Sequence, residues 1–404
     1  MAAEVLTKFS PDCGACEITL NRPDKLNALN LNMIRRLHEA VDKVDAKLGK
    51  VGCLIMDGAG GKAFCAGGDV QMIREEGLAG GSLPADFFFE EYGIVFRLAT
   101  LLGRTGCVQV SLFDGITMGG GVGLSTHGPF RIVTEKTRFA MPEMAIGLFP
   151  DVGATQILSR LKAGPAVGLF LGITGTNISA WDCLEAGVAT HYVPSARLPE
   201  LREKLLSRFR AGLVGAAAMK LCEEIIAETS SGSSARSENP VLSAENLSVI
   251  NRCFNAPTVE EIVVRLRAET CGFAAETLQK MFRSCSPTSC KVTLQAMQDL
   301  QRTPRSIGEV LQIEYRLSQR FTTRPQPLSD FFEGIRAVLV DKDRKQKWTP
   351  SWDSLDEVTE AKVSEFFSPL DAGHSRGELH LEDIFAFSES RRSAFPEVHL
   401  KSKL

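Results

Sequence analysis

Two acidic residues stand in an otherwise apolar segment, FAMPEMAIGLFPDVGA, at residues 139–154. They are Glu143 and Asp151, and two glycines and two prolines accompany them. A carboxylate can act as a nucleophile or can take a proton from water as a general base. Acids also cap helices or form ion pairs, and that structural alternative stands beside the catalytic one. We therefore interpret the segment as a candidate for nucleophilic or acid–base chemistry.

Two glycine loops precede this segment, CAGGDV at residues 65–70 and MGGGVG at residues 118–123, each after an apolar run. Glycine lets a backbone N–H approach a ligand closely, and two such groups aimed at one oxygen form an oxyanion hole. Either loop alone is more typical of a tight turn. Together, and followed by the segment with two acids, the loops favour the oxyanion hole.

Several other catalytic signatures are absent from the sequence, among them GxSxG, HExxH and GxxxxGK[ST]. The six histidines are dispersed, which favours structural or surface roles over a ligand cluster. Cys13 and Cys16 form a lone CxxC beside Pro11 and Gly14, which predicts a turn rather than a metal or redox site. We therefore expect no bound metal, and chemistry that rests on glycines and carboxylates.

The apolar patterns predict the elements that position these residues. CEITLNRP at residues 16–23 and VGCLIMDG at residues 51–58 read as strands, and residues 27–46 have helical periodicity behind asparagine caps. Residues 107–125 repeat the order of strand, glycine loop and helix. This recurrence predicts an α/β fold whose loops carry the chemistry.

Composition excludes some classes of function. The chain has 404 residues, 44% of them hydrophobic, and 46 Lys plus Arg against 49 Asp plus Glu give a net charge of -3. There is no overall basic field, so we expect no nucleic-acid partner. No apolar run approaches the roughly 20 residues that span a bilayer, so we also expect no membrane span.

Both ends of the chain, and its cysteines, bear on the compartment. The 11 scattered cysteines do not suggest a disulfide framework, which favours a reducing environment. The first residues show neither a signal peptide nor an Arg-rich transit pattern. Ser402, Lys403 and Leu404 end the chain with the tripeptide read by the peroxisomal import receptor. We therefore predict a peroxisomal protein with that receptor as a partner, with mitochondria or the cytoplasm as the alternatives.

Several motifs in order resemble the crotonase (enoyl-CoA hydratase/isomerase) superfamily and, within it, the family that hydrolyses 3-hydroxyisobutyryl-CoA. They are LNRPDKLNALN, KAFCAGGDV, GITMGGGVGLS, FAMPEMAIGLFPDVGA, SPTSCKVTL, EYRLSQR and FFEGIRAVLVDKDRKQKW. The resemblance runs from about Val5 to Phe367. It implies a spiral core of repeated ββα units with helices of the second half packed over it. We place the core at residues 1–228, a flexible Ser-rich connection at 229–240, a helical region at 241–370 and a tail at 371–404.

The resemblance also implies a site for acyl-coenzyme A thioesters. The thioester carbonyl oxygen would be held by the N–H groups of Gly68 and Gly120, with Glu143 and Asp151 as catalytic carboxylates. Glu91, in FFFEEY, would bind substrate. Coenzyme A is part of the substrate, so no separate cofactor is implied. Further substrate-binding positions implied by the match are Lys25, Ala28, Ala66 and Gly67, with basic residues around Lys342 near the phosphates.

One position departs from the hydratases of this superfamily, which carry a glutamate immediately after the second glycine loop. Here that position is Gly123, and a glycine cannot transfer a proton. The departure disfavours addition of water to a double bond by that route. The resemblance implies hydrolysis of the 3-hydroxyisobutyryl-CoA thioester, a step of valine breakdown, instead. Another short 3-hydroxyacyl- or branched acyl-CoA, hydratase or isomerase activity, and a silent coenzyme A-binding protein stay as alternatives. The sequence leaves the oligomeric state open, with a homo-oligomer among the choices.

Overall fold

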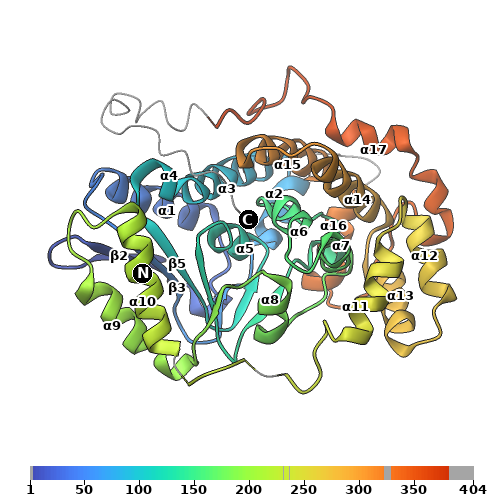
Figure 1. Ribbon diagram of the computed structural model, residues 1–404. Helices are drawn as coiled ribbons and strands as arrows, with labels where there is room; N and C mark the ends of the chain where they lie inside the picture. Colours follow the sequence, from blue (N-terminus) through green and yellow to red (C-terminus); the bar gives the residue numbers. More distant parts are fainter. Residues whose placement is uncertain (1–2, 231, 236, 323–328, 382–404) are drawn as a thin grey trace.

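The computed structural model describes residues 3–230, 232–235, 237–322 and 329–381, and it has the expected α/β fold (Figure 1). A six-stranded sheet with the order β1-β2-β3-β5-β7-β9 runs through the first half of the chain. All neighbouring strands in it are parallel except β1 and β2, which are antiparallel. The strands are β1 Val5–Phe9, β2 Ala15–Leu20, β3 Cys53–Gly58, β5 Val108–Phe113, β7 Phe130–Val133 and β9 His191–Tyr192.

A second, three-stranded parallel sheet lies beside the first, in the order β4-β6-β8. Each of its strands follows directly on a strand of the large sheet, and a helical segment comes next. The chain thus repeats one unit three times: β3, β4 and α2; β5, β6 and α5; β7, β8 and a 3₁₀ helix. This is the predicted recurrence of ββα units. The bounds are β4 Ala63–Cys65, β6 Ile116–Met118, β8 Arg138–Ala140, α2 Val70–Leu78, α5 Gly120–Ser125 and the 3₁₀ helix Glu143–Ile146.

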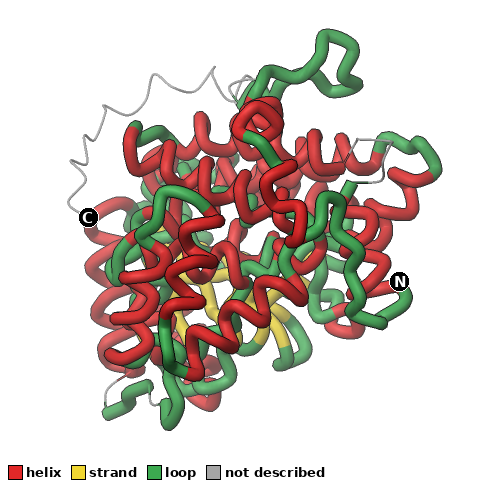
Figure 2. Tube along the Cα trace, turned by 90° about the vertical axis from the view of Figure 1, so that its right-hand side faces the viewer, coloured by secondary structure: helices red, strands yellow, loops and turns green. Residues whose placement is uncertain are grey.

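The large sheet is buried on both faces because successive side chains point to opposite sides. In β3, Cys53 and Ile55 belong to one apolar cluster, while Leu54 and Met56 belong to another. Helices α9 and α10 cover the first cluster and lie together beside the strands in Figure 1. Figure 2 shows the strands in the interior with helices around them. The remaining helices of the first half are α1 Leu31–Asp45, α3 Leu83–Ala99, α4 Leu101–Thr105, α6 Ala154–Ser159, α7 Pro165–Thr174, α8 Ala180–Ala186, α9 Leu198–Arg208 and α10 Gly215–Ser230.

Helix α1 begins later than the start of its periodic pattern. Asn30 caps it, and its side chain accepts a hydrogen bond from the N–H of Met33 at 2.7 Å. Residues 26–29 precede this cap and lie against the first glycine loop instead. The predicted helix and its asparagine cap are confirmed, and the residues before the cap are hydrogen-bonded to the first glycine loop.

The second half of the chain is helical, as expected, and it packs on the core. Helix α14 contacts α6 and α7, and α15 runs along α3 (Figure 1). Helix α10 continues through Ser230, so the predicted connection at residues 229–240 begins in a helix. The helices are α11 Ala244–Phe254, α12 Val259–Ala268, α13 Gly272–Ser284, α14 Pro287–Arg302, α15 Ile307–Thr322, α16 Asp330–Ile335 and α17 Glu360–Phe367, with a π helix at Arg336–Val340 and shorter 3₁₀ helices at Pro23–Lys25, Ser195–Arg197 and Trp352–Glu357.

Within the described ranges, no helix has the length and apolar character needed to cross a membrane. All of the cysteines lie in the described part, and none is in a disulfide.

Candidate active site

The first glycine loop continues from β4 and pairs with the segment that precedes α1. Leu29 donates its N–H to Gly67 O at 2.8 Å, and Asp69 donates its N–H to Leu29 O at 2.7 Å. These bonds hold the residues on either side of Gly68 and leave its own N–H outside the pairing. Gly67 has a φ of 104°, which a residue with a side chain rarely adopts. The loop is therefore rigidly placed, with the Gly68 amide available to a ligand.

The second glycine loop touches the first. A Cβ added to Gly67 would lie 3.5 Å from Met118 O and 3.8 Å from Gly120 N. Gly119 turns the chain with a φ of 49°, and Gly120 is the first residue of α5. The N–H of a first helical residue has no acceptor within its own helix. The predicted donors thus lie on two loops in contact, an arrangement that suits convergence on one oxygen.

Glu143 begins the 3₁₀ helix that follows β8, and its carboxylate meets the second loop. A Cβ on Gly119 would lie 2.9 Å from Glu143 Oε1, so only a glycine there allows this approach. The residue is 5% exposed, and Oε2 has no hydrogen-bond partner among the described residues. Buried carboxylate oxygens are normally paired. The unpaired oxygen therefore marks Glu143 as a group kept for a ligand.

Glu91 lies on α3 and faces the same loop. It is 2% exposed, and a Cβ on Gly120 would overlap its Oε1. This oxygen also lacks a hydrogen-bond partner in the part of the chain that the structure describes. The structure therefore brings Glu91, Glu143 and the two glycine loops together, as the resemblance implies.

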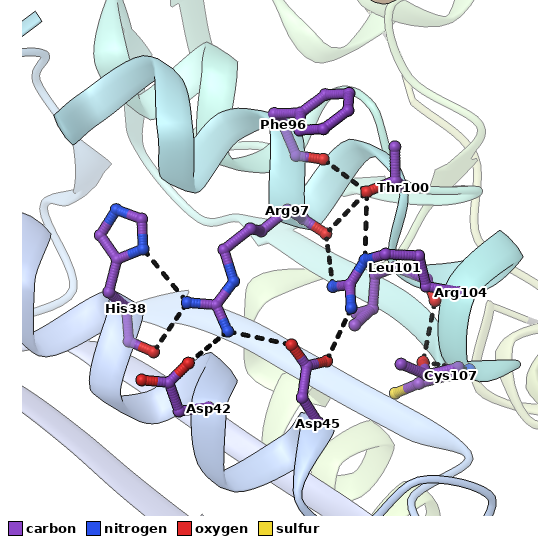
Figure 3. A network of polar contacts seen from close by, with 10 residues as sticks. His38, Asp42, Asp45, Phe96, Arg97, Thr100, Leu101, Arg104 and Cys107 are labelled. Atoms are coloured by element: carbon purple, nitrogen blue, oxygen red, sulfur yellow. Dashed lines mark hydrogen bonds and ion pairs between the residues drawn. The ribbon is translucent and has the colours of Figure 1, made fainter. Parts of the chain in front are cut away.

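A network of charged side chains anchors α3 to α1 (Figure 3). The guanidinium of Arg97, which is 7% exposed, contacts Asp42 at 2.6 Å and Asp45 at 2.9 Å. Arg104 adds a second contact to Asp45 at 3.0 Å, and Arg97 also meets His38. Because Arg97 lies on the helix that carries Glu91, this network holds that helix against α1.

Asp151 lies on a tight turn between the 3₁₀ helix and α6. It is 4% exposed, and Tyr92 donates its hydroxyl hydrogen to Asp151 Oδ2 at 2.7 Å. Tyr92 follows Glu91 directly on α3, so one helix turn presents an acid and a phenol to the same site. The fold also brings the two acids of the segment at residues 139–154 close enough for the charge of Asp151 to raise the pKa of Glu143.

Burial raises the pKa of all three carboxylates, and neighbouring acids raise those of Glu143 and Glu91 further. Burial raises the pKa of Asp151 to about 7, while the hydrogen bond from Tyr92 acts in the opposite direction. Burial and the charge of Asp151 raise the pKa of Glu143 well above its ordinary value. Burial, then Asp151 and Glu143, do the same to the pKa of Glu91. Because buried like charges cannot all ionise at low cost, we infer that the three carboxylates together retain at least one proton near neutral pH.

Gly123 lies against the Asp151 turn. A Cβ at this position would overlap Val152 Cβ and lie 2.8 Å from Val152 Cγ2 and 3.1 Å from Val95 Cγ2. A second glutamate, which the hydratases carry here, therefore has no room in this chain. The side chains of Val152 and Val95, packed against Gly123, therefore exclude that acid in this arrangement.

The sequence analysis missed three residues that bind the Asp151 turn. They are Tyr92, His127 and Glu314, all buried or largely buried and in hydrogen-bond contact with residues 151–155. A signal existed for two of them, because Tyr92 adjoins Glu91 in FFFEEY and Glu314 begins the quoted EYRLSQR. His127 was interpreted as structural, and nothing in its neighbourhood in the sequence indicated this contact.

Two of the predicted coenzyme A positions, Ala28 and Ala66, lie in the pairing of the first glycine loop with the segment that precedes α1. Lys25 is exposed and Ala28 is half-buried, in the segment that pairs with the first loop. Ala66 donates its N–H within this pairing, to Leu26 O at 3.0 Å. Lys342 lies in an exposed loop after the π helix. The structure is compatible with these predictions and assigns no contact that tests them.

A separate groove of about 830 Å³ lies between β1, β2 and α9. None of the residues that line it belongs to the glycine loops or to the carboxylate cluster. Across the described ranges, no group of three or more His, Cys, Asp or Glu side chains is arranged to hold a metal ion. The carboxylate cluster is therefore the arrangement in which acid–base chemistry and oxyanion donors coincide.

Comparison with known proteins gives the class. Residues 15–367 match the family model for enoyl-CoA hydratase/isomerase, so the chain belongs to that family. The solved structure of a carnitinyl-CoA dehydratase from Mycobacterium thermoresistibile is similar, with a TM-score of 0.78 and 33% identity. The likeness covers 94% of this chain and 99% of that chain.

Relatives with curated names are more specific. A protein of Xenopus laevis is 43% identical over 87% of this chain and 86% of its own length, and one of Homo sapiens is 42% identical over 91% and 89%. Both are named mitochondrial 3-hydroxyisobutyryl-CoA hydrolase.

These names contradict the prediction that the protein is peroxisomal. The prediction of the peroxisomal import receptor as a partner is therefore not supported either. A targeting tripeptide is an address read by a receptor and makes no demand on the fold, so three residues carry far less information than a likeness over most of the chain. Ser402, Lys403 and Leu404 lie outside the described residues.

Proposed function

We propose that the protein hydrolyses the thioester of 3-hydroxyisobutyryl-CoA to 3-hydroxyisobutyrate and coenzyme A, a step in valine breakdown. Relatives of that name, at 43% and 42% identity over most of the chain, support the substrate, and their names point to mitochondria. The observation that carries the reaction type is the contact of Gly123 with Val152, which leaves no room for the second acid of a hydratase. Asp151, paired with Tyr92, supplies an acid elsewhere in the site.

The chemistry begins with the carbonyl oxygen of the thioester between the N–H groups of Gly68 and Gly120. Negative charge develops on this oxygen in the transition state, and each well-placed donor contributes about 3 kcal/mol to its stabilisation. Ionised Glu143 either attacks the carbonyl carbon to form an anhydride or takes a proton from a water that attacks. In both routes the C–S bond breaks, and water supplies the OH of the acid and the proton of the thiol.

Asp151 acts on the leaving group. Its pKa of about 7 allows the protonated form to donate to the departing thiolate and the ionised form to accept a proton later. The hydroxyl of Tyr92 holds one carboxylate oxygen at 2.7 Å and leaves the other to the reaction. Glu91 binds the 3-hydroxyl through its unpaired Oε1, so an acyl chain without that hydroxyl leaves a buried acid unpaired.

The coenzyme A end lies along the edge of the first glycine loop. Residues 25–28 and 66–67 line the nucleotide side, and the basic loop around Lys342 meets the phosphates. Coenzyme A arrives and leaves as part of substrate and product, and the proposed reaction uses no other cofactor or metal.

Thiol release by the purified protein tests this function. We expect kcat/KM to be highest for 3-hydroxyisobutyryl-CoA in a panel that includes 3-hydroxypropionyl-, isobutyryl- and crotonyl-CoA. Isobutyryl-CoA, which lacks only the hydroxyl, is the matched control for the role of Glu91. Faster hydration of crotonyl-CoA than thiol release from 3-hydroxyisobutyryl-CoA would overturn the hydrolase.

A further inference from the structure

The turn that carries Asp151 is strained. Val152, a β-branched residue, has a φ of 57°, and Gly153 follows with a φ of 81°. A non-glycine residue in this region costs about 1–3 kcal/mol and persists only where its surroundings impose it. The next element, α6, has glycine at its N-cap and no side-chain hydrogen bond there. Contacts from distant parts of the chain must therefore hold this turn.

Glu314, on α15, supplies the missing cap. Its Oε2 accepts the N–H of Gly153 at 2.6 Å, and its Oε1 accepts the hydroxyl of Thr155 at 2.6 Å and the N–H of Thr155 at 3.3 Å. The residue is 1% exposed. A buried acid is costly unless its hydrogen bonds are made, and both oxygens here are used. The carboxylate thus fixes the first turn of α6, two residues beyond Asp151.

His127 contacts Val152, the residue between Asp151 and Gly153. Its Nε2 lies 3.0 Å from Val152 O, and burial lowers the pKa of the imidazole to about 4. The ring is therefore neutral near pH 7, and the contact requires the tautomer that donates from Nε2.

Helix α15 also orients the partner of Asp151. Tyr315, next to Glu314, packs edge to face on Tyr92 with ring centroids 6.3 Å apart, and edge to face on Phe89 at 5.8 Å. Helix α15 therefore contacts both partners of the Tyr92–Asp151 pair: Glu314 contacts the turn that carries Asp151, and Tyr315 contacts the ring of Tyr92. This gives a role to the first two residues of the EYRLSQR segment, which the proposed reaction itself does not use.

We propose that Glu314 is a positioning residue for Asp151: its carboxylate holds the first turn of α6 and keeps Val152 left-handed, so that Asp151 meets Tyr92 in the reactive geometry. The proposal rests on the proposed function, in which Asp151 is the acid that serves the leaving group. Glu314 touches no reacting atom and acts through the turn.

Glu314→Gln tests the proposal because the amide keeps the shape but sets an NH₂ against the Gly153 or Thr155 donors. We expect kcat for 3-hydroxyisobutyryl-CoA to fall about tenfold or more, with KM within about twofold, because the coenzyme A contacts lie on other loops. Glu309→Gln is the matched control: Glu309 is exposed and caps α15 itself through Ser306. Its kcat should be unchanged.

A double-mutant cycle separates positioning from general stability. If Glu314 acts through Asp151, Glu314→Gln should have almost no further effect on kcat in an Asp151→Asn background. Equal losses in both backgrounds would overturn the positioning role. An Asp151→Asn variant with full activity would instead remove Asp151 from the proposed reaction, which distinguishes the two failures.

A milder variant keeps the test open if Glu314→Gln does not fold. Thr155→Val removes only the hydroxyl bonded to Glu314 Oε1, and it should lower kcat by about two- to fivefold, again only while Asp151 is present. Unchanged kcat in this variant would overturn the proposal in that case.

Discussion

At the scale of single residues, the site depends on glycines that let acids and backbones approach one another. Gly119 leaves room for Glu143, Gly120 leaves room for Glu91, and Gly123 leaves room for Val152. A methyl group at any of them would displace a carboxylate or the Asp151 turn. The residue types around the acids therefore control the geometry as much as the acids themselves do.

Glu143→Gln should lower kcat by about 10² or more, because the amide is neither basic nor nucleophilic. Substrate binding should remain within about threefold, since the oxyanion donors are backbone groups that the change leaves in place. Rapid-quench turnover and calorimetric binding measure the two effects. Glu185→Gln, at an exposed position on α8, is the control. Retained turnover in Glu143→Gln would remove this residue from the reaction.

Gly123→Glu should not create a hydratase. Its Cβ would overlap Val152, whose backbone is already strained, so the variant should unfold at lower temperature and lose thiol release. Gly103→Glu is the control, because an added Cβ there meets nothing within 4 Å. Efficient hydration of crotonyl-CoA by Gly123→Glu, at wild-type stability, would contradict this account.

At the scale of elements, helix α3 is held in the site by ion pairs between Arg97 and two aspartates of α1. The helix carries Glu91 and Tyr92 toward the acids, and Arg97 ties it to α1. Helix α1 is in turn held by its cap and its buried face, beside the segment that pairs with the first glycine loop. Helix α1 therefore helps to position both the first glycine loop and the Glu91 carboxylate.

Arg97→Met should destabilise the fold by about 2 kcal/mol, since it removes a largely buried charge-assisted contact to two carboxylates. Urea unfolding measures the change. The control is Arg36→Met, which breaks a pair with Glu39 whose side chains are 56% and 53% exposed, and which should cost less than about 1 kcal/mol. Equal losses in the free energy of unfolding would show that the α1–α3 network stabilises the fold no more than an exposed ion pair does.

At the scale of the whole molecule, the second half of the chain completes a site that the first half begins. The glycine loops and the acids lie within residues 65–151, yet Glu314 and Tyr315 on α15 hold the Asp151 turn and its tyrosine. The helical region therefore contributes to the chemistry through position, in addition to covering the core.

The buried acids should make the free energy of unfolding fall as pH rises. Burial raises the pKa of Asp151 to about 7, and burial together with the charges of Asp151 and Glu143 raises the pKa of Glu91 well above its ordinary value. The stability that their protonated forms contribute is therefore lost as pH rises through the pKa values of the folded state. The buried His127, with a pKa lowered to about 4, acts in the opposite sense, but its contribution is complete above about pH 6.5.

Between about pH 6.5 and 8.5, urea unfolding at constant ionic strength should therefore show a loss on the order of 1 kcal/mol per pH unit. The slope should be shallower in Asp151→Asn, which removes the group with a pKa of about 7. A stability that rises across this window would contradict the assignment of buried, proton-retaining acids.

Much of the site followed from the sequence because its local signals are strong. The glycine loops, the asparagine-capped helix and the alternating apolar strands each depend on neighbours in the chain, and the absence of an acid at Gly123 is visible in one letter. The order of strand, loop and helix predicted that a unit recurs, and the resemblance to the crotonase superfamily implied its ββα form. The terminal tripeptide misled, because it makes no demand on the fold and nothing else in the chain depends on it.

Tertiary structure alone decided which distant groups meet. Tyr92, His127 and Glu314 reach the Asp151 turn from three separate elements, and hydrogen bonds over such separations leave no periodic pattern in the sequence. The same holds for the raised pKa values, which arise from burial and from charges that only the folded chain brings together. Residue types thus determined what chemistry was available, and packing determined where Asp151 stands and what holds it there.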